Sequence, residues 1–302
     1  MPPMVEVIIN ERSGAADKEE ARRQLADIFA ASGIEARISL ARRAGEVVNL
    51  ARRAIDGAAQ TIVAGGGDGT VNAVASIVAG SNKTFGVVPL GTLNHFAKDL
   101  HIPLDLEGAA RTVIAGHSIK IDVGEVNERI FVNNSSLGLY PSMVREREKA
   151  QRLGHGKWPA FLWAVLTVLR RYPFLNVRLI VDSTDFATRT PFVFVGNNVY
   201  EMESFNIGTR ARLDAGVLSL YVTHRTGRLG MLRLGLRALF RRLRKAEDFI
   251  ALTTTEVLVE TRRRRVRVST DGEVTMMQTP LQYRVRPGVL SVLVPEETQA
   301  TN

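Results

Sequence analysis

Residues 61–70, with the sequence TIVAGGGDGT, decide the fold of this chain of 302 residues. An apolar run leads into four glycines around Asp68, and the segment that follows, Val71 to Ile77, reads as a helix. Glycines let backbone N–H groups approach a polyphosphate with no Cβ in the way, and a helix start offers its positive end to the same anion. The stretch therefore predicts a strand, a phosphate-binding loop and a helix, with Asp68 placed to hold a nucleotide-bound Mg²⁺ directly or through water.

The alternative for this stretch is a glycine-rich turn between a strand and a helix, with Asp68 as the helix cap. That alternative explains one or two glycines, but it does not explain four glycines around an aspartate. The loop is neither a Walker loop, because no Lys-Ser/Thr pair closes it, nor a dinucleotide fingerprint, because the G-x-G-x-x-G spacing is missing.

Around the glycine loop, short apolar strands alternate with helical patterns through the first 124 residues. The predicted strands are Val5 to Ile9, Ala36 to Leu40, Thr61 to Val63, Phe85 to Val88 and Ile119 to Val123. This alternation is typical of an α/β domain with a parallel sheet covered on both faces, which binds ligands at the carboxyl ends of its strands. We therefore expect the loops at Asn10, Gly65 and Gly91 to meet at one edge.

Beyond about Gly124 the alternation gives way to short β-rich segments that are interrupted by two helical stretches, 159–170 and 229–245. This pattern favours an antiparallel, sandwich-like arrangement. The sequence thus predicts an N-terminal α/β nucleotide-binding domain at residues 1–124 and a β-rich C-terminal domain at residues 125–302.

The composition limits the classes of partner and chemistry. Lys and Arg number 40 against 31 for Asp and Glu, and this net charge of +9 favours an anionic partner. The chain has no cysteine, which excludes disulfides, thiolate catalysis and Cys-ligated metals. Aromatic residues make up only 6% of the chain and are not interleaved with the basic ones, so we expect no nucleic-acid partner.

Membrane contact is expected to be peripheral. The N-terminus has no signal-peptide pattern, and the longest apolar run, Trp158 to Leu169, is shorter than the ~20 residues that span a bilayer. Residues 225–245 hold eight basic and no acidic residues around an apolar stripe. The helix at 228–245 either packs on the core with a solvated basic face or docks on anionic lipid, and the run Arg262 to Arg265 could extend the same patch. We expect a cytoplasmic protein, peripheral at the inner membrane face, and a homodimer stays open.

Three motifs together resemble the diacylglycerol kinase catalytic-domain family, which includes bacterial soluble lipid kinases and sphingosine and ceramide kinases. They are Gly65-Gly66-Gly67-Asp68-Gly69-Thr70, Pro89-Leu90-Gly91-Thr92-Leu93-Asn94 and Asp271-Gly272-Glu273. The resemblance implies a NAD kinase/diacylglycerol kinase-like fold and an ATP- and Mg²⁺-dependent kinase acting on a lipid hydroxyl, with diacylglycerol as the expected lipid substrate and phosphatidic acid as its product. The alternatives are a NAD-kinase-like small-molecule kinase and a non-catalytic nucleotide or lipid sensor.

The resemblance also implies roles for single residues. The nucleotide site would comprise the glycine motif and two further loops, namely Asn10, Ser13, Gly14, Gly65, Gly66, Gly67, Asp68, Gly69, Thr70, Gly91, Thr92 and Asn94. Asp271 would be the general base and Glu273 its acidic neighbour, facing the same way if the turn between them stays extended. A carboxylate suits that role because a primary alcohol is a poor nucleophile until its proton is accepted. Taken alone, Asp-Gly-Glu is more typical of a plain β-turn.

Glu11 replaces a proline of the family's first loop, and two further departures from the family pattern bear on the metal site. His95 stands where the family usually has an Asp after Asn94, and an imidazole holds Mg²⁺ poorly. The segment Leu213 to Leu218 resembles the Asp-Asp-Gly segment of the family, but Asp214 is the only one of the two acids that is present there. Together with Asp68, we consider Asp122 and Asp214 as supporting Mg²⁺ ligands, with a turn cap as the alternative for each.

Overall fold

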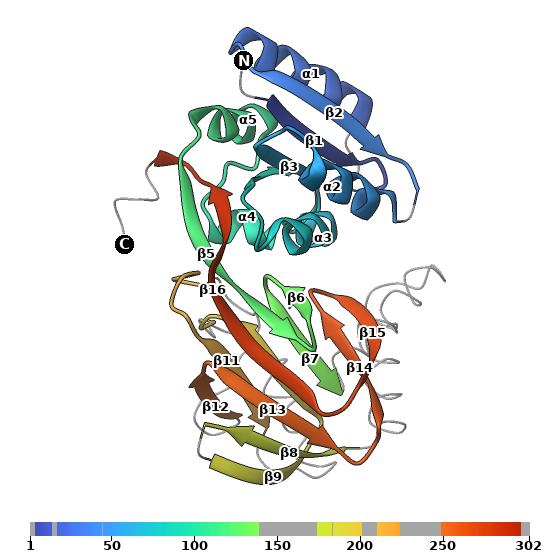
Figure 1. The fold of residues 1–302 in the computed structure, drawn as a ribbon, viewed down its shortest axis with the longest axis vertical. Helices are drawn as coiled ribbons and strands as arrows, with labels where there is room; N and C mark the ends of the chain where they lie inside the picture. The colour runs from blue at the N-terminus through green and yellow to red at the C-terminus, as the bar shows by residue number, and fades with distance from the viewer. Residues whose placement is uncertain are drawn as a thin grey trace, which may run out of the picture. The chain divides into compact units, whose positions relative to one another are not determined.

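The computed structural model describes residues 4–13, 17–43, 45–138, 174–182, 184–200, 210–223 and 249–296. The chain divides into two compact units (Figure 1). Unit 1 comprises Met1–Val123 and Arg286–Asn302, and unit 2 comprises Gly124–Val285.

Unit 1 is built on a parallel sheet in the order β2-β1-β3-β4. The strands are β1 (Met4–Asn10), β2 (Glu35–Ala41), β3 (Thr61–Gly66) and β4 (Thr84–Pro89). The helices are α1 (Lys18–Ala31), α2 (Glu46–Asp56), α3 (Asp68–Val78), α4 (His95–Asp99) and α5 (Leu106–Ala115). Strands alternate with helices, which confirms the predicted α/β fold.

Both faces of this sheet are covered because its strands are apolar on both sides. In β1 every residue from Val5 to Ile9 is buried, which is the pattern of a central parallel strand. Helix α1 contacts α5, and α2 contacts α3. Right-handed crossovers that leave β1 and β2 in opposite directions place these two helix pairs on opposite faces.

Unit 2 is an antiparallel β-sandwich, as the sequence predicted. One sheet has the order β12-β11-β10-β7-β14-β15, and the other contains β13, β8 and β9 beside the first part of β16. The two sheets share one core, in which Leu179 of β8 and Val259 of β13 pack in the same cluster as Leu137 of β7 and Val195 of β10.

The strands of unit 2 are short, as expected for a sandwich. They are β6 (Arg129–Phe131), β7 (Asn134–Gly138), β8 (Leu175–Val181), β9 (Thr184–Thr190), β10 (Phe192–Asn197), β11 (Leu218–Thr223), β12 (Phe249–Thr254), β13 (Glu256–Thr261), β14 (Arg265–Thr270) and β15 (Glu273–Gln278). The predicted helices at 159–170 and 229–245 lie outside the described residues, and so does the basic segment 228–245. Within the described parts of the chain, no helix combines the length and the apolar character needed to cross a bilayer.

Two strands, β5 (Ser118–Val126) and β16 (Leu281–Leu293), run through both units. The first part of β16 pairs antiparallel with β13, and its later residues Ser291 and Val292 pair parallel with β4. The sequence places everything after residue 124 in the second domain, whereas residues 286–302 belong to unit 1 in the structure. The pairing with β4 joins residues some two hundred positions apart, so no local pattern signals it.

Candidate active site

The glycine motif forms the connection between β3 and α3. Gly67 caps the helix with an extended backbone, and its carbonyl accepts the N–H groups of Thr70 at 2.9 Å and of Val71 at 3.1 Å. The first N–H groups of a helix have no partner within the helix, and no side chain in the described part of the chain caps α3. These amides therefore present a site for an anion.

The three predicted loops meet at the carboxyl edge of the sheet, which confirms that expectation. Strand β1 lies between β2 and β3, so the connections leave it in opposite directions, and ligands of such sheets bind at that point. The Nδ2 of Asn10 donates to the Oγ1 of Thr70 at 2.9 Å, which joins the first loop to the second. A Cβ built on Gly91 would lie 2.4 Å from the Cα of Gly67, so the second and third loops touch backbone to backbone.

The glycines of the motif have different reasons to be glycine. A Cβ on Gly65 would lie 2.8 Å from the Ile9 side chain, and a Cβ on Gly66 would lie 2.6 Å from the Thr70 side chain. Both residues are buried in β3, so packing accounts for them rather than contact with a phosphate. A Cβ on Gly69 would meet no atom within 4 Å. The part of the motif open to a ligand is therefore Gly67 to Gly69.

The other two loops are held by their own polar groups. In the first, the Oγ of Ser13 donates to the Asn10 carbonyl at 2.7 Å, while Gly14 lies outside the described residues. In the third, Asn94 is buried with a left-handed backbone, and its side chain exchanges hydrogen bonds with the N–H and carbonyl of Gly91 at 3.1 and 3.0 Å. Thr92 is exposed beside it.

Asp68 is the acidic group of the glycine motif. It is partly buried, and its Oδ1 accepts the N–H of Phe96 at 3.3 Å, which ties α3 to α4. His95 begins α4 and is exposed. Among the residues that the structure describes, no group of three or more His, Asp or Glu side chains could hold a metal. One carboxylate with the oxygens of a nucleotide is a common Mg²⁺ arrangement, and Asp68 fits it.

The two other predicted metal ligands have structural partners instead. Asp122 is buried on β5, and its Oδ1 accepts the N–H of Gly288 in β16 at 3.0 Å. Arg212 binds both oxygens of Asp214, at 3.0 and 3.2 Å, and holds the pKa of that carboxyl below its ordinary value. A strand anchor and an ion pair account for these carboxylates, which favours the structural alternative over a role in binding Mg²⁺.

Asp271 occupies the two-residue turn of the hairpin β14–β15. Its φ is 50° and that of Gly272 is 86°, the combination that a type I′ turn requires and that Asp-Gly supplies. The carboxylate accepts three backbone N–H groups from the segment 132–134. Oδ1 accepts those of Asn133 at 2.8 Å and Asn134 at 3.0 Å, and Oδ2 accepts that of Val132 at 2.8 Å. Since each oxygen has two lone pairs, Oδ2 keeps one for a further donor.

The environment of Asp271 also changes its proton affinity. The residue keeps some exposed surface, but its carboxylate is surrounded by the 132–134 segment. Burial raises the pKa of Asp271 to about 6, while the three N–H groups and the charge of Arg210 act in the opposite direction. A carboxylate that titrates near neutral pH is suited to accept a proton as a general base.

The structure does not support the prediction that Glu273 lies beside Asp271 as its acidic neighbour. The type I′ turn reverses the chain, so the extended turn on which that prediction depended is absent. Its carboxylate is exposed and pairs with the Nη2 of Arg129 at 2.7 Å. A type I′ turn requires a positive φ at both central residues, so the backbone between Asp271 and Glu273 is not extended.

Sequence reasoning missed Arg210, which is only 3% exposed. Its Nη1 donates to the Val132 carbonyl at 2.7 Å and its Nη2 to the Oδ1 of Asn133 at 2.8 Å. The guanidinium also lies over the Tyr200 ring, 5.4 Å from its centroid. Arg210 thus holds the segment that binds the Asp271 carboxylate. An isolated Arg in an irregular stretch carries no signal of such a role.

Buried hydroxyl groups near Asp271 are a second feature that the sequence did not indicate. The hydroxyls of Ser136, Ser269 and Thr270 are buried and have no hydrogen-bond partner among the residues that the structure describes. Ser136 and Ser269 are directly opposite each other on β7 and β14, and Thr270 immediately precedes Asp271. Buried polar groups are rarely left unpaired, so this end of the sheet is suited to a polar ligand or ordered water.

Known families cover both parts of the chain. Residues 4–126 match the family described as diacylglycerol kinase catalytic domain, and residues 138–294 match the family described as YegS C-terminal NAD kinase beta sandwich-like domain. The chain is 29% identical over 227 residues to a diacylglycerol kinase of Staphylococcus aureus strain MRSA252, spanning 73% of this chain and 70% of that protein. It is 28% identical over 226 residues to a diacylglycerol kinase of Staphylococcus carnosus strain TM300, spanning 72% of each.

Solved structures have the same fold. A diacylglycerol kinase from Bacillus anthracis str. Sterne superposes with a TM-score of 0.72 at 19% identity, covering 98% of both chains. A second structure from that organism superposes with a TM-score of 0.77 at 22% identity and the same coverage. At such identities these likenesses show the fold alone.

Proposed function

The chain belongs to the diacylglycerol kinase catalytic-domain family, and from this membership we propose that it is an ATP-dependent lipid kinase. It transfers the γ-phosphoryl group of ATP to a lipid hydroxyl, and the lipid class we propose is diacylglycerol, giving phosphatidic acid. The observation that carries this proposal is the Asp271 carboxylate, which three backbone N–H groups orient while Oδ2 keeps a free lone pair.

The nucleotide half of the proposal rests on the N-terminus of α3. The amides from Gly67 to Gly69 receive phosphate oxygens, because no described side chain caps this helix and a Cβ on Gly69 would meet no protein atom within 4 Å. Asp68 would help to hold a nucleotide-bound Mg²⁺, which would supply neutralisation of the phosphate charge. Asn10 supports the loop by donating to the Thr70 hydroxyl.

The acceptor half rests on Asp271. Oδ2 accepts the proton of the lipid hydroxyl while the hydroxyl oxygen forms a bond to the γ-phosphorus of ATP. The bond between that phosphorus and the leaving oxygen of ADP breaks in the same step. Arg210 and the segment 132–134 keep the carboxylate in one orientation throughout. The pairing of Glu273 with Arg129 leaves Asp271 as the proton acceptor in this proposal.

Membrane association through the basic segment 228–245, at the inner face of a cytoplasmic membrane, completes the proposal. The net charge of +9 supports it, since anionic surfaces attract basic proteins.

Transfer of labelled γ-phosphate from ATP tests the proposed function. The panel holds diacylglycerol, monoacylglycerol, sphingosine and ceramide in mixed micelles, and NAD in solution, each with Mg²⁺. We expect label in diacylglycerol. Label in NAD alone would support a small-molecule kinase instead, and ATP binding without label in any acceptor would support a non-catalytic sensor.

The pH dependence of turnover follows from the raised pKa of Asp271. Only the ionised carboxylate accepts a proton, so kcat/KM is expected to fall with decreasing pH through an apparent pKa of about 6. Above that pH the activity should level off, because the carboxylate is then fully ionised. Initial rates measured from about pH 5 to pH 8 check this, with a second buffer series as the control. A flat profile down to about pH 5 would contradict the role of Asp271.

A further inference from the structure

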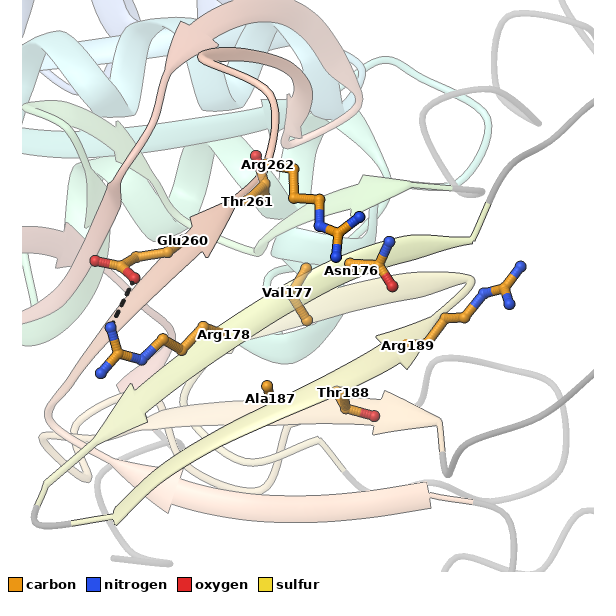
Figure 2. A pocket seen from close by; sticks show the side chains of 9 residues that line it. All are labelled: Asn176, Val177, Arg178, Ala187, Thr188, Arg189, Glu260, Thr261 and Arg262. Atoms are coloured by element: carbon orange, nitrogen blue, oxygen red, sulfur yellow. Dashed lines mark hydrogen bonds and ion pairs between the residues drawn. The ribbon is translucent and has the colours of Figure 1, made fainter.

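An open groove lies on the outer face of the sheet β8, β9 and β13 in unit 2, with a volume of about 520 Å³ (Figure 2). The other face of the same strands packs into the sandwich core, where Val177 and Val259 are buried. Asp271 lies on the other sheet of the sandwich, in the β14–β15 turn. The groove is therefore separate from the proposed acceptor site.

The strand register places one arginine on each side of the Asn176 position in this groove. Asn176 of β8 pairs directly with Arg189 of β9. On the opposite side of β8, Thr261 pairs with Val177, so the next residue, Arg262, follows on beside Asn176. All three side chains are exposed. Figure 2 shows Arg262 and Asn176 close together over β8, while Arg189 lies farther along the neighbouring strand with its guanidinium group directed away from them.

The charges of the groove do not cancel. Its carboxylate, on Glu260, pairs with the Nη1 of Arg178 at 3.3 Å, and the Nε of Arg178 also donates to Asp185 at 2.9 Å. That group of one arginine and two carboxylates carries a net charge of −1, so Arg178 adds no free positive charge to the groove. Arg189 stacks over the Phe174 ring at 4.8 Å, and in the described part of the chain neither Arg189 nor Arg262 forms an ion pair. Two positive charges beside an amide donor thus lack an anion.

This arrangement matches the chemistry of a phosphate group. Guanidinium groups present paired N–H donors that fit phosphate oxygens, and an amide N–H adds a third donor. From Arg262 the run of arginines continues through Arg265, and all four are exposed at the β13–β14 turn. A single soluble phosphate would leave most of this run without a partner, whereas a charged surface would meet all of it.

We propose that this groove binds the phosphate of an anionic phospholipid headgroup at a membrane surface, with Arg262 and Asn176 as its ligands and Arg189 as a further positive charge on the neighbouring strand. The site shares no residue with the segment 228–245 or with the proposed acceptor site. It would hold unit 2 against anionic membranes while the lipid substrate reacts elsewhere.

Vesicle sedimentation of the full-length protein tests the proposal, using phosphatidylcholine vesicles with and without phosphatidylglycerol. The double variant Arg189→Gln/Arg262→Gln is expected to bind the anionic vesicles about tenfold more weakly than the wild type. The control is Arg43→Gln/Arg52→Gln, which removes the same charge from exposed positions of unit 1 and should bind within about twofold of the wild type. Equal binding by all three proteins, or equal weakening of both variants, would overturn the proposal.

Two further measurements separate a lipid phosphate from a soluble phosphate ester as the ligand, and the groove from the catalytic site. Glycerol 3-phosphate should bind too weakly to displace the protein from vesicles, and displacement that depends on Arg189 and Arg262 would assign the groove to a soluble phosphate ester instead. Kinase activity in neutral detergent micelles should be the same for the groove variant and the wild type. A groove variant that loses this kinase activity would show that the groove belongs to the catalytic site. A wild-type protein that phosphorylates none of the acceptors would count against the proposed function and not against the groove.

Discussion

Replacing Asp271 by asparagine is expected to lower kcat by a factor of at least about 10², with ATP still bound. The Asn side chain has the same shape and can still accept N–H groups of the 132–134 segment through its oxygen. Its amide nitrogen cannot take a proton from the lipid hydroxyl, and it would replace the oxygen that now accepts the Val132 N–H. The measurement is steady-state turnover at saturating ATP and lipid, above pH 7.

The matched control for this variant is Glu273→Gln. Glu273 is exposed and pairs with Arg129 at the surface, so its loss should cost no more than about 1 kcal/mol of stability and leave kcat nearly unchanged. Thermal unfolding of both variants separates a loss of fold from a loss of chemistry. An Asp271→Asn enzyme that turns over within about threefold of the wild type would remove the general base from the mechanism.

Replacing Gly91 by alanine is expected to weaken ATP binding by about tenfold or more, which corresponds to about 1.4 kcal/mol. The new Cβ would lie 2.4 Å from the Cα of Gly67 and 2.8 Å from the Asn94 side chain. Because the first of these is backbone, the contact is relieved only if the third loop moves away from the helix cap. That movement would open the edge where the phosphates bind, and calorimetric titration with ATP measures it.

Gly69→Ala makes the matching test within the same site. Its Cβ would meet no protein atom, and in a helix alanine is more favourable than glycine by about 1 kcal/mol, so thermal stability should rise. ATP affinity should fall nevertheless, because the added methyl group occupies space in front of the α3 amides. Unchanged ATP affinity in both variants would show that the nucleotide does not bind at the start of α3. If Gly91→Ala does not fold, Gly69→Ala still provides the test.

The sequence by itself determined the architecture and the position of the nucleotide edge. Alternating apolar strands and helices specify a parallel sheet, and parallel strands bring their carboxyl ends together. The sequence alone therefore predicts that the loops at Asn10, Gly65 and Gly91 lie side by side. The Asn10–Thr70 hydrogen bond confirms this for the first two loops, and the contact of Gly91 with Gly67 confirms it for the third. The antiparallel, β-rich character of the second half was also readable, because a succession of short β-rich segments is visible along the chain itself.

Only the tertiary structure decided what the single residues do. Packing against Ile9 and Thr70 explains Gly65 and Gly66, and a strand anchor explains Asp122, although a sequence motif marks each of them as a ligand. The carboxylate of Asp271 is oriented by a segment about 140 positions earlier, which Arg210 holds in place. Periodicity and local motifs report only on neighbours in the chain, whereas these contacts arise from the way distant strands pair. The groove beside Asn176 has the same origin, since its two flanking arginines come from strands that are neighbours in the sheet but distant in sequence.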